Sequence, residues 1–256
     1  MKRHEPLVRI SREQARSLAR IRIGPPVARV YHPLLYAREP WERYLRRYAG
    51  TAKEAVFVGM NPGPWGMAQT GVPFGTVGLV RDWLGIEGRV GRPARSHPKR
   101  PVLGFACPRR EVSGERFWGW ARRRFATPDR FFDRFFVANY CPLLFLDAAG
   151  RNLTPDHLPA ARTRAIFAIC DRALRRTVEA LRPRIVIGIG RFAEKRAREA
   201  LDGIDIRIDW IPPEPREPPG QRGLGAGHGA CARGDGDPDR EVRRARTSRA
   251  RLESAG

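Results

Sequence analysis

Short apolar segments that alternate with amphipathic ones constrain the fold of this chain more than any other feature of its sequence. Three of them have the mostly apolar composition of buried strands, and a fourth alternates polar and apolar residues: 55–59, 134–140, 185–190 and 204–211. Helical periodicity fills stretches between them, at 41–48, 113–125, 162–181 and 191–201. Alternating strands and helices are typical of an α/β fold, so we predict a parallel sheet that helices cover on both faces.

The first strand leads into a loop, residues 59–75, that is rich in glycine and proline. Such a loop follows a rigid path and lets a ligand approach its backbone closely. It carries an amide, Asn61, and a ring, Phe74, while a second amide, Asn139, ends the next strand. Ligands of parallel sheets bind beyond the carboxyl ends of the strands. The two amides and the ring therefore suit a flat polar ligand such as a nucleobase, and a structural turn around a buried Phe74 is the alternative.

The charge of the chain indicates a polyanionic partner. The formal net charge is +22, and arginine, which suits bidentate phosphate contacts, greatly outnumbers lysine. Nucleic acid is the first candidate partner, and an anionic membrane surface is the second. No segment approaches the ~20 apolar residues of a membrane span, and the first ten residues lack an apolar signal core. We therefore expect an intracellular protein.

The cysteines do not have the spacing of a structural zinc site. They lie far apart, without a Cys-x-x-Cys pair, at Cys107, Cys141, Cys170 and Cys231. Reduced thiols are the simplest interpretation, and an iron–sulfur cluster is the alternative. The sequence Gly188-Ile-Gly190 after a strand resembles part of a dinucleotide fingerprint, but the next strand lacks a well-placed acid for the ribose.

Five motifs, in order, resemble the single-strand-selective monofunctional uracil-DNA glycosylases over about residues 20–211: GMNPGPWGMAQTGVPFG, HPKRPVLG, EVSGERFWGW, NYCPLLFLDAAGRNLTP and RIVIGIGRFAEKRAREAL. The resemblance implies the uracil-DNA glycosylase fold, a three-layer α/β/α arrangement with a central four-stranded parallel sheet. It also implies hydrolysis of the N-glycosidic bond of uracil and 5-hydroxymethyluracil in single- and double-stranded DNA, a step of base excision repair. It implies no metal and no cofactor. We expect a monomer that acts in the cytoplasm or nucleoid of a bacterium or in the nucleus of a eukaryote.

The resemblance also assigns roles to residues of this sequence. Asn61 matches the catalytic Asn that positions the attacking water, and Phe74 matches the ring that stacks on the flipped base. Asn139 matches the amide that reads the polar edge of uracil. Met60 and Gly63 match the pocket wall near C5 of the base.

Three more residues match a stretch of the family that lies near DNA, between 150 and 163. They are candidate contacts to the DNA backbone: Arg151, Asn152 and Thr154.

The sequence departs from the family after the fourth strand. The family has a His-Pro-Ser-Pro motif there, whose His donates to uracil O2, followed by a DNA-wedging loop and a last helix. Here residues 212–215 read Pro-Pro-Glu-Pro. Residues 212–256 have no aromatic residue and few bulky aliphatic ones, a composition that predicts disorder. We therefore expect a glycosylase domain over 1–211, a non-family tail over 212–256, and impaired catalysis in the chain as written.

A shift of reading frame near the codon for Pro212 accounts for this departure. Residues 212–224 can be encoded so that reading one base later gives His-Pro-Ser-Pro-Gly-Ser-Pro-Arg-Ala-Asn-Ala-Ala-Trp, which restores the motif. A genuinely diverged C-terminus is the alternative, and sequencing the gene around this codon distinguishes the two. Two other functions stay open: a catalytically weak DNA- or uracil-binding protein, and a xanthine or hypoxanthine glycosylase of the same fold.

Overall fold

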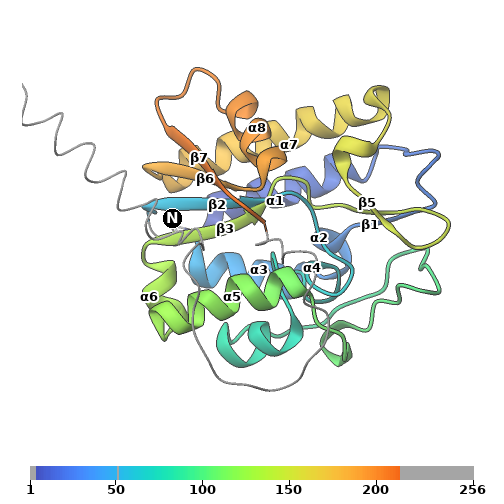
Figure 1. Ribbon diagram of the computed structural model, residues 1–256, viewed down its shortest axis with the longest axis horizontal. Coiled ribbons are helices and arrows are strands. Elements are labelled where there is room, and N and C mark those ends of the chain that lie inside the picture. Colours follow the sequence, from blue (N-terminus) through green and yellow to red (C-terminus); the bar gives the residue numbers. More distant parts are fainter. Residues whose placement is uncertain (1–3, 51, 214–256) are drawn as a thin grey trace, which may run out of the picture.

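Four parallel strands form the centre of the molecule in a computed structural model, which describes residues 4–50 and 52–213, apart from the side chains of 161 and 162. The strands are β2 (Ala55–Gly59), β3 (Phe135–Asn139), β6 (Ile185–Ile189) and β7 (Arg207–Ile211). Their order in the sheet is β3-β2-β6-β7, and every pairing is parallel (Figure 1). The predicted central four-stranded parallel sheet is therefore confirmed.

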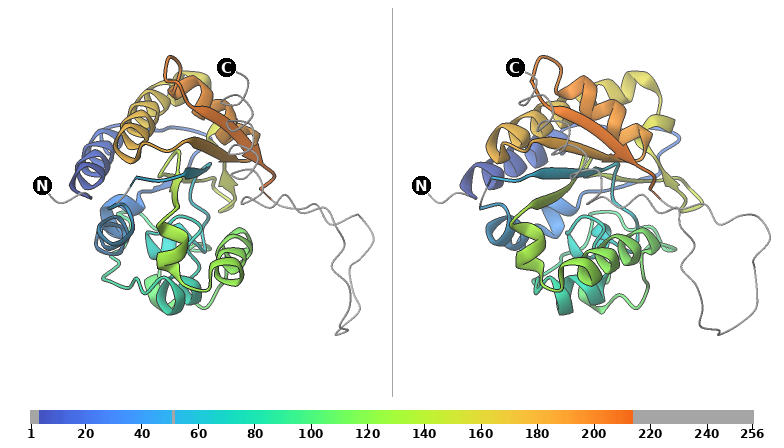
Figure 2. Two further views of the ribbon diagram at one scale, coloured as in Figure 1. Left: turned by 90° about the vertical axis from the view of Figure 1, so that its left-hand side faces the viewer. Right: turned by 60° about the vertical axis from the view of Figure 1, so that its left-hand side comes forward.

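Helices lie on both faces of this sheet, as the alternation of elements predicts. On one side lie α1 (Glu5–Leu18), α7 (Ala160–Leu181) and α8 (Arg191–Ala200), and on the other α5 (Val112–Phe125) and α6 (Pro128–Phe132) (Figure 2). Helix α3 (Arg38–Tyr48) contacts β3, the strand at one end of the sheet, where the Tyr44 hydroxyl donates to the Val137 carbonyl at 2.9 Å.

The core is rich in aromatic rings on the α5 and α6 side. The Phe57 ring in β2 meets those of Phe117 and Phe131 with centroid distances of 5.6 and 6.4 Å. All five residues of β2 and of β6 are buried, which agrees with their mostly apolar sequence. These two strands lie in the middle of the sheet, so both of their faces are covered.

A second, antiparallel sheet lies beside the first and was not predicted. Its order is β1-β4-β5, with β1 at Arg29–Tyr31, β4 at Leu144–Leu146 and β5 at Asn152–Leu153. Strands of two or three residues carry too few side chains to show a period, so their sequence gives no signal. This sheet holds the hairpin of residues 147–151, which contains part of the predicted DNA-contacting stretch.

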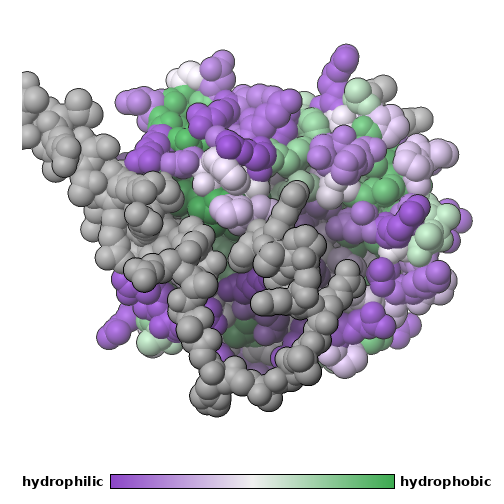
Figure 3. Space-filling model, viewed as in Figure 1, coloured by the Kyte–Doolittle hydropathy of each residue, from purple (hydrophilic) through white to green (hydrophobic). Residues whose placement is uncertain are grey.

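The remaining elements are short. They are the helices α2 (Pro33–Tyr36) and α4 (Met67–Thr70), a π-helical turn at Leu79–Trp83, and two 3-10 turns at Gly104–Ala106 and Pro155–His157. No helix in the described part of the chain is long and apolar enough to cross a membrane. The described residues on the face seen in Figure 3 are mostly hydrophilic, with small hydrophobic areas between them.

Candidate active site

The loops that follow β2 and β3 leave the sheet together at its carboxyl edge. Gly59 and Asn139, the last residues of the two strands, are paired in register. Beyond them, the Tyr140 N–H donates to the Gly59 carbonyl at 2.8 Å and the Cys141 N–H donates to the Met60 carbonyl at 2.9 Å. Asn61 and Asn139 therefore project from adjacent, hydrogen-bonded segments, as the strand-end argument predicts.

Gly59 leaves the space in which Phe74 and Asn139 meet. A Cβ atom on Gly59 would lie 2.5 Å from Oδ1 of Asn139 and 2.6 Å from Cζ of Phe74. Real Cβ atoms do not approach other heavy atoms so closely, so only glycine fits here. Two of the predicted site residues, Phe74 from the loop after β2 and Asn139 from the end of β3, thus reach the same space beside Gly59.

Phe74 has an unusual backbone conformation that its neighbours maintain. Its φ angle is +55°, a left-handed value that costs a non-glycine residue about 1–3 kcal/mol. The Phe74 ring stacks on Phe117 at 5.3 Å, and the Trp118 indole N–H donates to the Pro73 carbonyl at 3.0 Å. Gly114 lets helix α5 approach, because a Cβ there would lie 2.1 Å from the Phe74 carbonyl oxygen. Helix α5 therefore holds the ring in a fixed position.

The orientation of the Asn61 side chain is set by one hydrogen bond. Its Nδ2 donates to the Leu143 carbonyl at 3.3 Å, with oxygen and nitrogen assigned from this contact. The side chain is half-buried. With Nδ2 engaged, Oδ1 is the group that can accept a hydrogen bond from a bound molecule.

The Asn139 amide donates to a weak hydrogen-bond acceptor. Its Nδ2 lies 3.2 Å from the Met67 sulfur, and the side chain is half-buried. A thioether is a poor acceptor, so a carbonyl oxygen of a ligand can replace it at little cost.

Gly63 and Met60, the two residues matched to the pocket wall, have different surroundings. A Cβ on Gly63 would lie 2.3 to 2.5 Å from the Glu111 carboxylate, which accepts a 2.9 Å hydrogen bond from the Trp65 N–H. Glu111 thus fills the bare side of Gly63 and holds the loop. Met60 is half-buried, and its carbonyl is the acceptor for Cys141. Sequence reasoning missed Glu111, since nothing in the sequence links it to a loop so far away.

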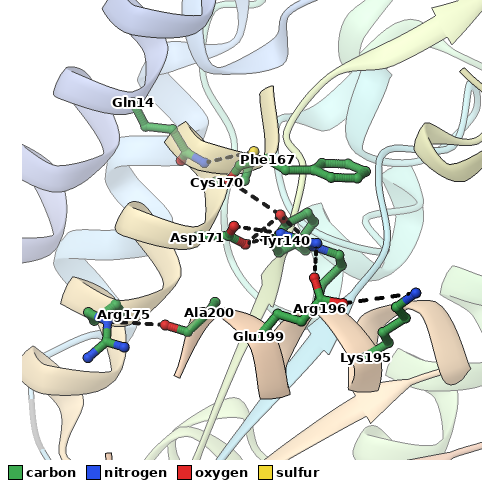
Figure 4. Close-up of polar contacts among 10 residues, drawn as sticks. All are labelled: Gln14, Tyr140, Phe167, Cys170, Asp171, Arg175, Lys195, Arg196, Glu199 and Ala200. Carbon is green, nitrogen blue, oxygen red and sulfur yellow. Dashed lines mark hydrogen bonds and ion pairs between the residues drawn. The ribbon is translucent and has the colours of Figure 1, made fainter. Parts of the chain in front are cut away.

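A partly buried polar network fixes Tyr140, the residue after Asn139 (Figure 4). The Tyr140 hydroxyl donates to Asp171 of α7 at 2.6 Å and accepts from Nε of Arg196 of α8 at 2.8 Å. Arg196 also donates to both Asp171 oxygens, at 2.7 and 2.5 Å. Burial, and then the bond to Asp171, raise the pKa of Tyr140 far above its usual value. The neutral phenol therefore links both helices to the end of β3, and no sequence signal indicated this network.

The three candidate DNA contacts lie on and after the 147–151 hairpin. Nε of Arg151 pairs with Asp147 at 2.6 Å, and hydrogen bonds from the backbone and side chain of Arg151 hold the pKa of Asp147 below its usual value. Asn152 is exposed in β5, and the Thr154 hydroxyl lies 2.7 Å from Nδ1 of His157. These residues thus belong to a different loop from Asn61.

The end of β7 is the last described part of the chain. The Gly190 N–H donates to the Ile211 carbonyl at 2.8 Å, and the Arg191 guanidinium lies 3.7 Å from the centre of the Trp210 ring. Pro212, which follows the strand where the family has its His, is exposed. The predicted disorder and frame shift fall almost wholly on residues 214–256, which lie outside the described residues.

The described residues contain no group of three or more His, Cys, Asp or Glu side chains arranged to hold a metal ion. Cys107, Cys141 and Cys170 are buried free thiols, and Cys231 lies outside the described residues. The candidate site therefore rests on the two amides and the ring at the carboxyl edge of the parallel sheet: Asn61, Asn139 and Phe74.

Comparison with known proteins identifies this architecture. A family model described as the uracil DNA glycosylase superfamily matches residues 47–224. The crystal structure of Pedobacter heparinus SMUG2 has a similar fold, with a TM-score of 0.61 at 17% identity over 83% of this chain and 87% of that one. The class of protein is thus that of the uracil-DNA glycosylases.

Sequence similarity to known proteins identifies one family within this superfamily. The single-strand selective monofunctional uracil-DNA glycosylase of Rattus norvegicus is 48% identical over 238 residues, covering 86% of this chain and 86% of that protein. The Mus musculus protein of the same name is 51% identical over 209 residues, covering 80% and 75%. The chain belongs to this family of single-strand-selective monofunctional uracil-DNA glycosylases within the uracil-DNA glycosylase superfamily. The family-model match continues past Ile211 to residue 224, and the predicted boundary between domain and tail stays a prediction.

Proposed function

We propose that this chain hydrolyses the N-glycosidic bond of uracil and 5-hydroxymethyluracil in DNA, as a monofunctional glycosylase of base excision repair. The observation that carries the proposal is the meeting of the Phe74 ring and the Asn139 amide over Gly59. A ring and an amide side by side match a flat base with a polar edge. The target base leaves the stack to reach them, at a cost of a few kcal/mol that is lowest in single strands.

Base selection follows from the amide of Asn139. Its Nδ2 can leave the Met67 sulfur and donate to uracil O4, while Oδ1 accepts from the uracil N3–H. Cytosine presents the opposite pattern, a donor at C4 and an acceptor at N3, so it pairs poorly with the same amide. The Phe74 ring stacks on the base and stays in place because helix α5 supports it.

Hydrolysis is assigned to a water held by Asn61. Oδ1 accepts a hydrogen bond from this water while Nδ2 stays on the Leu143 carbonyl. The transition state carries positive charge on the sugar and negative charge on the departing uracil, so the water needs orientation more than a strong base. The C1′–N1 bond breaks with its electron pair on uracil, the water oxygen bonds to C1′, and the proton that the water loses passes through solvent to the uracil anion. Uracil and an abasic sugar are the products.

The departing base needs donors near O2, and this chain has Pro212 at the position of the family His. Proline has no side-chain donor, and loss of one such donor costs on the order of 10²–10³ in rate. We therefore assign reduced activity to the chain as written, with a greater loss on duplexes, where the wedging loop assists flipping.

The proposed enzyme acts alone on DNA, as a monomer, inside the cell. The excess of positive charge over the whole sequence supports a DNA partner, because Lys and Arg contacts release counterions from the phosphate backbone. Arg151, Asn152 and Thr154 are the proposed backbone contacts beside the hairpin. Met60 and Gly63 are the proposed wall near C5, with Glu111 behind Gly63.

Uracil release from a single-stranded oligonucleotide tests the proposal. We expect release by the purified chain, and a fall of at least about 10²-fold in the Asn61→Ala variant, which loses the water-positioning oxygen. Binding of DNA without release by the unmodified chain would instead support the weak binding protein. Preferential release of xanthine or hypoxanthine in a mixture of damaged bases would support the third function.

A further inference from the structure

A second cluster of aromatic and charged side chains lies beside the Asn61 loop. The guanidinium carbon of Arg109 lies 4.6 Å from the centre of the Trp65 ring, and that of Arg100 lies 5.2 Å from it. Trp65 belongs to the same loop as Asn61 and is half-buried, while Arg109 is exposed. We call Trp65, Arg100 and Arg109 the Trp65 clamp.

A buried side chain, that of Gln69, fixes the backbone on both sides of the contact between Trp65 and Arg100. Gln69 is fully buried, and its Nε2 donates to the Pro64 carbonyl at 2.9 Å and to the Pro101 carbonyl at 3.0 Å. Its Oε1 accepts from the Leu103 N–H at 2.8 Å. One side chain thus joins the segment before Trp65 to the segment after Arg100.

The same basic segment is also fixed to the 147–151 hairpin. Nε of Arg100 donates to the Gly150 carbonyl at 2.8 Å, and Nε2 of the buried His97 donates to the Ala148 carbonyl at 3.1 Å. The tautomer follows from Nδ1 of His97, which accepts from the Lys99 N–H at 3.1 Å. The clamp therefore lies where three segments meet: the Asn61 loop, residues 97–110 and the hairpin.

Among the residues that the structure describes, no ion pair neutralises the charges of the clamp. Within the described ranges, no carboxylate lies at ion-pair distance from Arg100 or Arg109. Glu111, two residues after Arg109 in the chain, uses one oxygen to accept from the Trp65 N–H at 2.9 Å. A guanidinium stacked on an indole keeps its N–H groups in a plane, directed outwards for a planar or tetrahedral anion.

We propose that the Trp65 clamp binds phosphates of the DNA strand that carries the target nucleotide. This inference rests on the proposed function, which brings that strand to Asn61, in the same loop as Trp65. Phosphate is favoured over a stacked base because the guanidinium groups already occupy the ring. Arg109 supplies the fuller fork, since Arg100 commits Nε to Gly150 and Nη1 to the Lys99 carbonyl.

Salt-dependent binding of a single-stranded oligonucleotide with a stable abasic-site analogue tests the clamp without requiring catalysis. The variants are Arg109→Gln and Arg100→Gln. The matched control is Arg184→Gln. Arg184 is exposed and lies just before β6, at the amino ends of the parallel strands, whereas the Asn61 loop lies at their carboxyl ends. Between about 50 and 200 mM salt, each clamp variant should lower the slope of log K against log salt by about 0.7. Its Kd should rise roughly tenfold at the lower salt concentration.

The Trp65→Leu variant tests whether binding depends on the orientation of the two arginines as well as on their charge. It keeps both arginines but removes the ring that holds them, and we expect the Kd to rise about threefold. Unchanged thermal unfolding of the Arg109→Gln variant checks that the fold is intact.

The outcomes distinguish the two proposals. An Arg109→Gln variant with the slope and Kd of the Arg184→Gln control overturns the clamp, whether or not uracil is released. Lower slopes in the clamp variants, with no uracil release by the unmodified chain, keep the clamp and reject the glycosylase.

Discussion

Replacing Gly59 with Ala is the sharpest perturbation of the proposed base pocket. The new Cβ would lie 2.5 Å from Oδ1 of Asn139 and 2.6 Å from Cζ of Phe74. Ordinary contacts are about 3.5 Å or more, so the amide and the ring must each move by about 1 Å. Phe74 has little freedom to move, because Phe117 supports its ring and its backbone is already left-handed.

The expected cost has a structural part and a catalytic part. Overpacking of this kind costs about 1–3 kcal/mol of the free energy of unfolding, and each kcal/mol lowers Tm by about 2–4 °C in a chain of this size. A displacement of about 1 Å in the groups that hold the base lowers the rate of uracil release by about 10²-fold. Thermal unfolding and single-turnover uracil release measure the two parts separately.

Gly78→Ala is the matched control for Gly59→Ala. Gly78 has a helical backbone, with φ −60° and ψ −46°, and its added Cβ would meet only Asp82 Oδ2 at 3.9 Å. This change should raise stability by about 0.4–1 kcal/mol and leave uracil release unaltered. Normal uracil release by the Gly59→Ala variant would refute the assignment of this space as the base pocket.

Three further predictions follow from other parts of the structure. Tyr140→Phe removes the hydroxyl bonded to Asp171 and should lower the free energy of unfolding in urea by about 1.5–3 kcal/mol, whereas an unchanged value would mean the network contributes no stability. Pro212→His supplies a donor at the end of β7 and should raise uracil release about ten- to a hundredfold; no increase would show that this position does not reach the base. Burial lowers the pKa of His32 to about 4. This pKa lies below the unfolded value of about 6.5, so the unfolded chain binds the His32 proton first as the pH falls. The free energy of unfolding therefore has its full value above about pH 6.5 and decreases towards pH 4, by at most about 3 kcal/mol. His32→Gln should flatten this acid limb in pH-dependent unfolding, and equal limbs in both proteins would contradict the reasoning.

The structure bears out those parts of the fold that local sequence patterns control. Strands β2, β3 and β6 lie where the apolar segments predict them, because a strand buried on both faces needs an unbroken apolar run. The β1–β4 pairing joins Arg29 to Leu146. No local pattern records such a contact between distant three-residue segments, so this sheet was missed.

Some features of the candidate site could likewise be predicted from sequence, and others could not. Asn61 and Asn139 could be placed together from sequence, since parallel strands bring their carboxyl ends to one edge of a sheet. The family resemblance added their proposed roles and that of Phe74. The orientation of each amide was not predictable, because it depends on partners, Leu143 and Met67, that come from other parts of the chain.

Local sequence patterns were enough to predict the parallel α/β class, the stiff loop between 59 and 75, the amides at two strand ends, and the motif missing after Ile211. These are properties of neighbouring residues and of strand direction, which act over short distances along the chain. Three contacts could be seen only in the folded chain: Phe74 meets Asn139 beside Gly59, Glu111 holds the loop at Gly63, and the Arg109 guanidinium lies over the Trp65 ring. Each of these contacts joins segments that come together only when the chain packs. Their geometry therefore depends on tertiary packing and cannot be predicted from any single stretch of sequence.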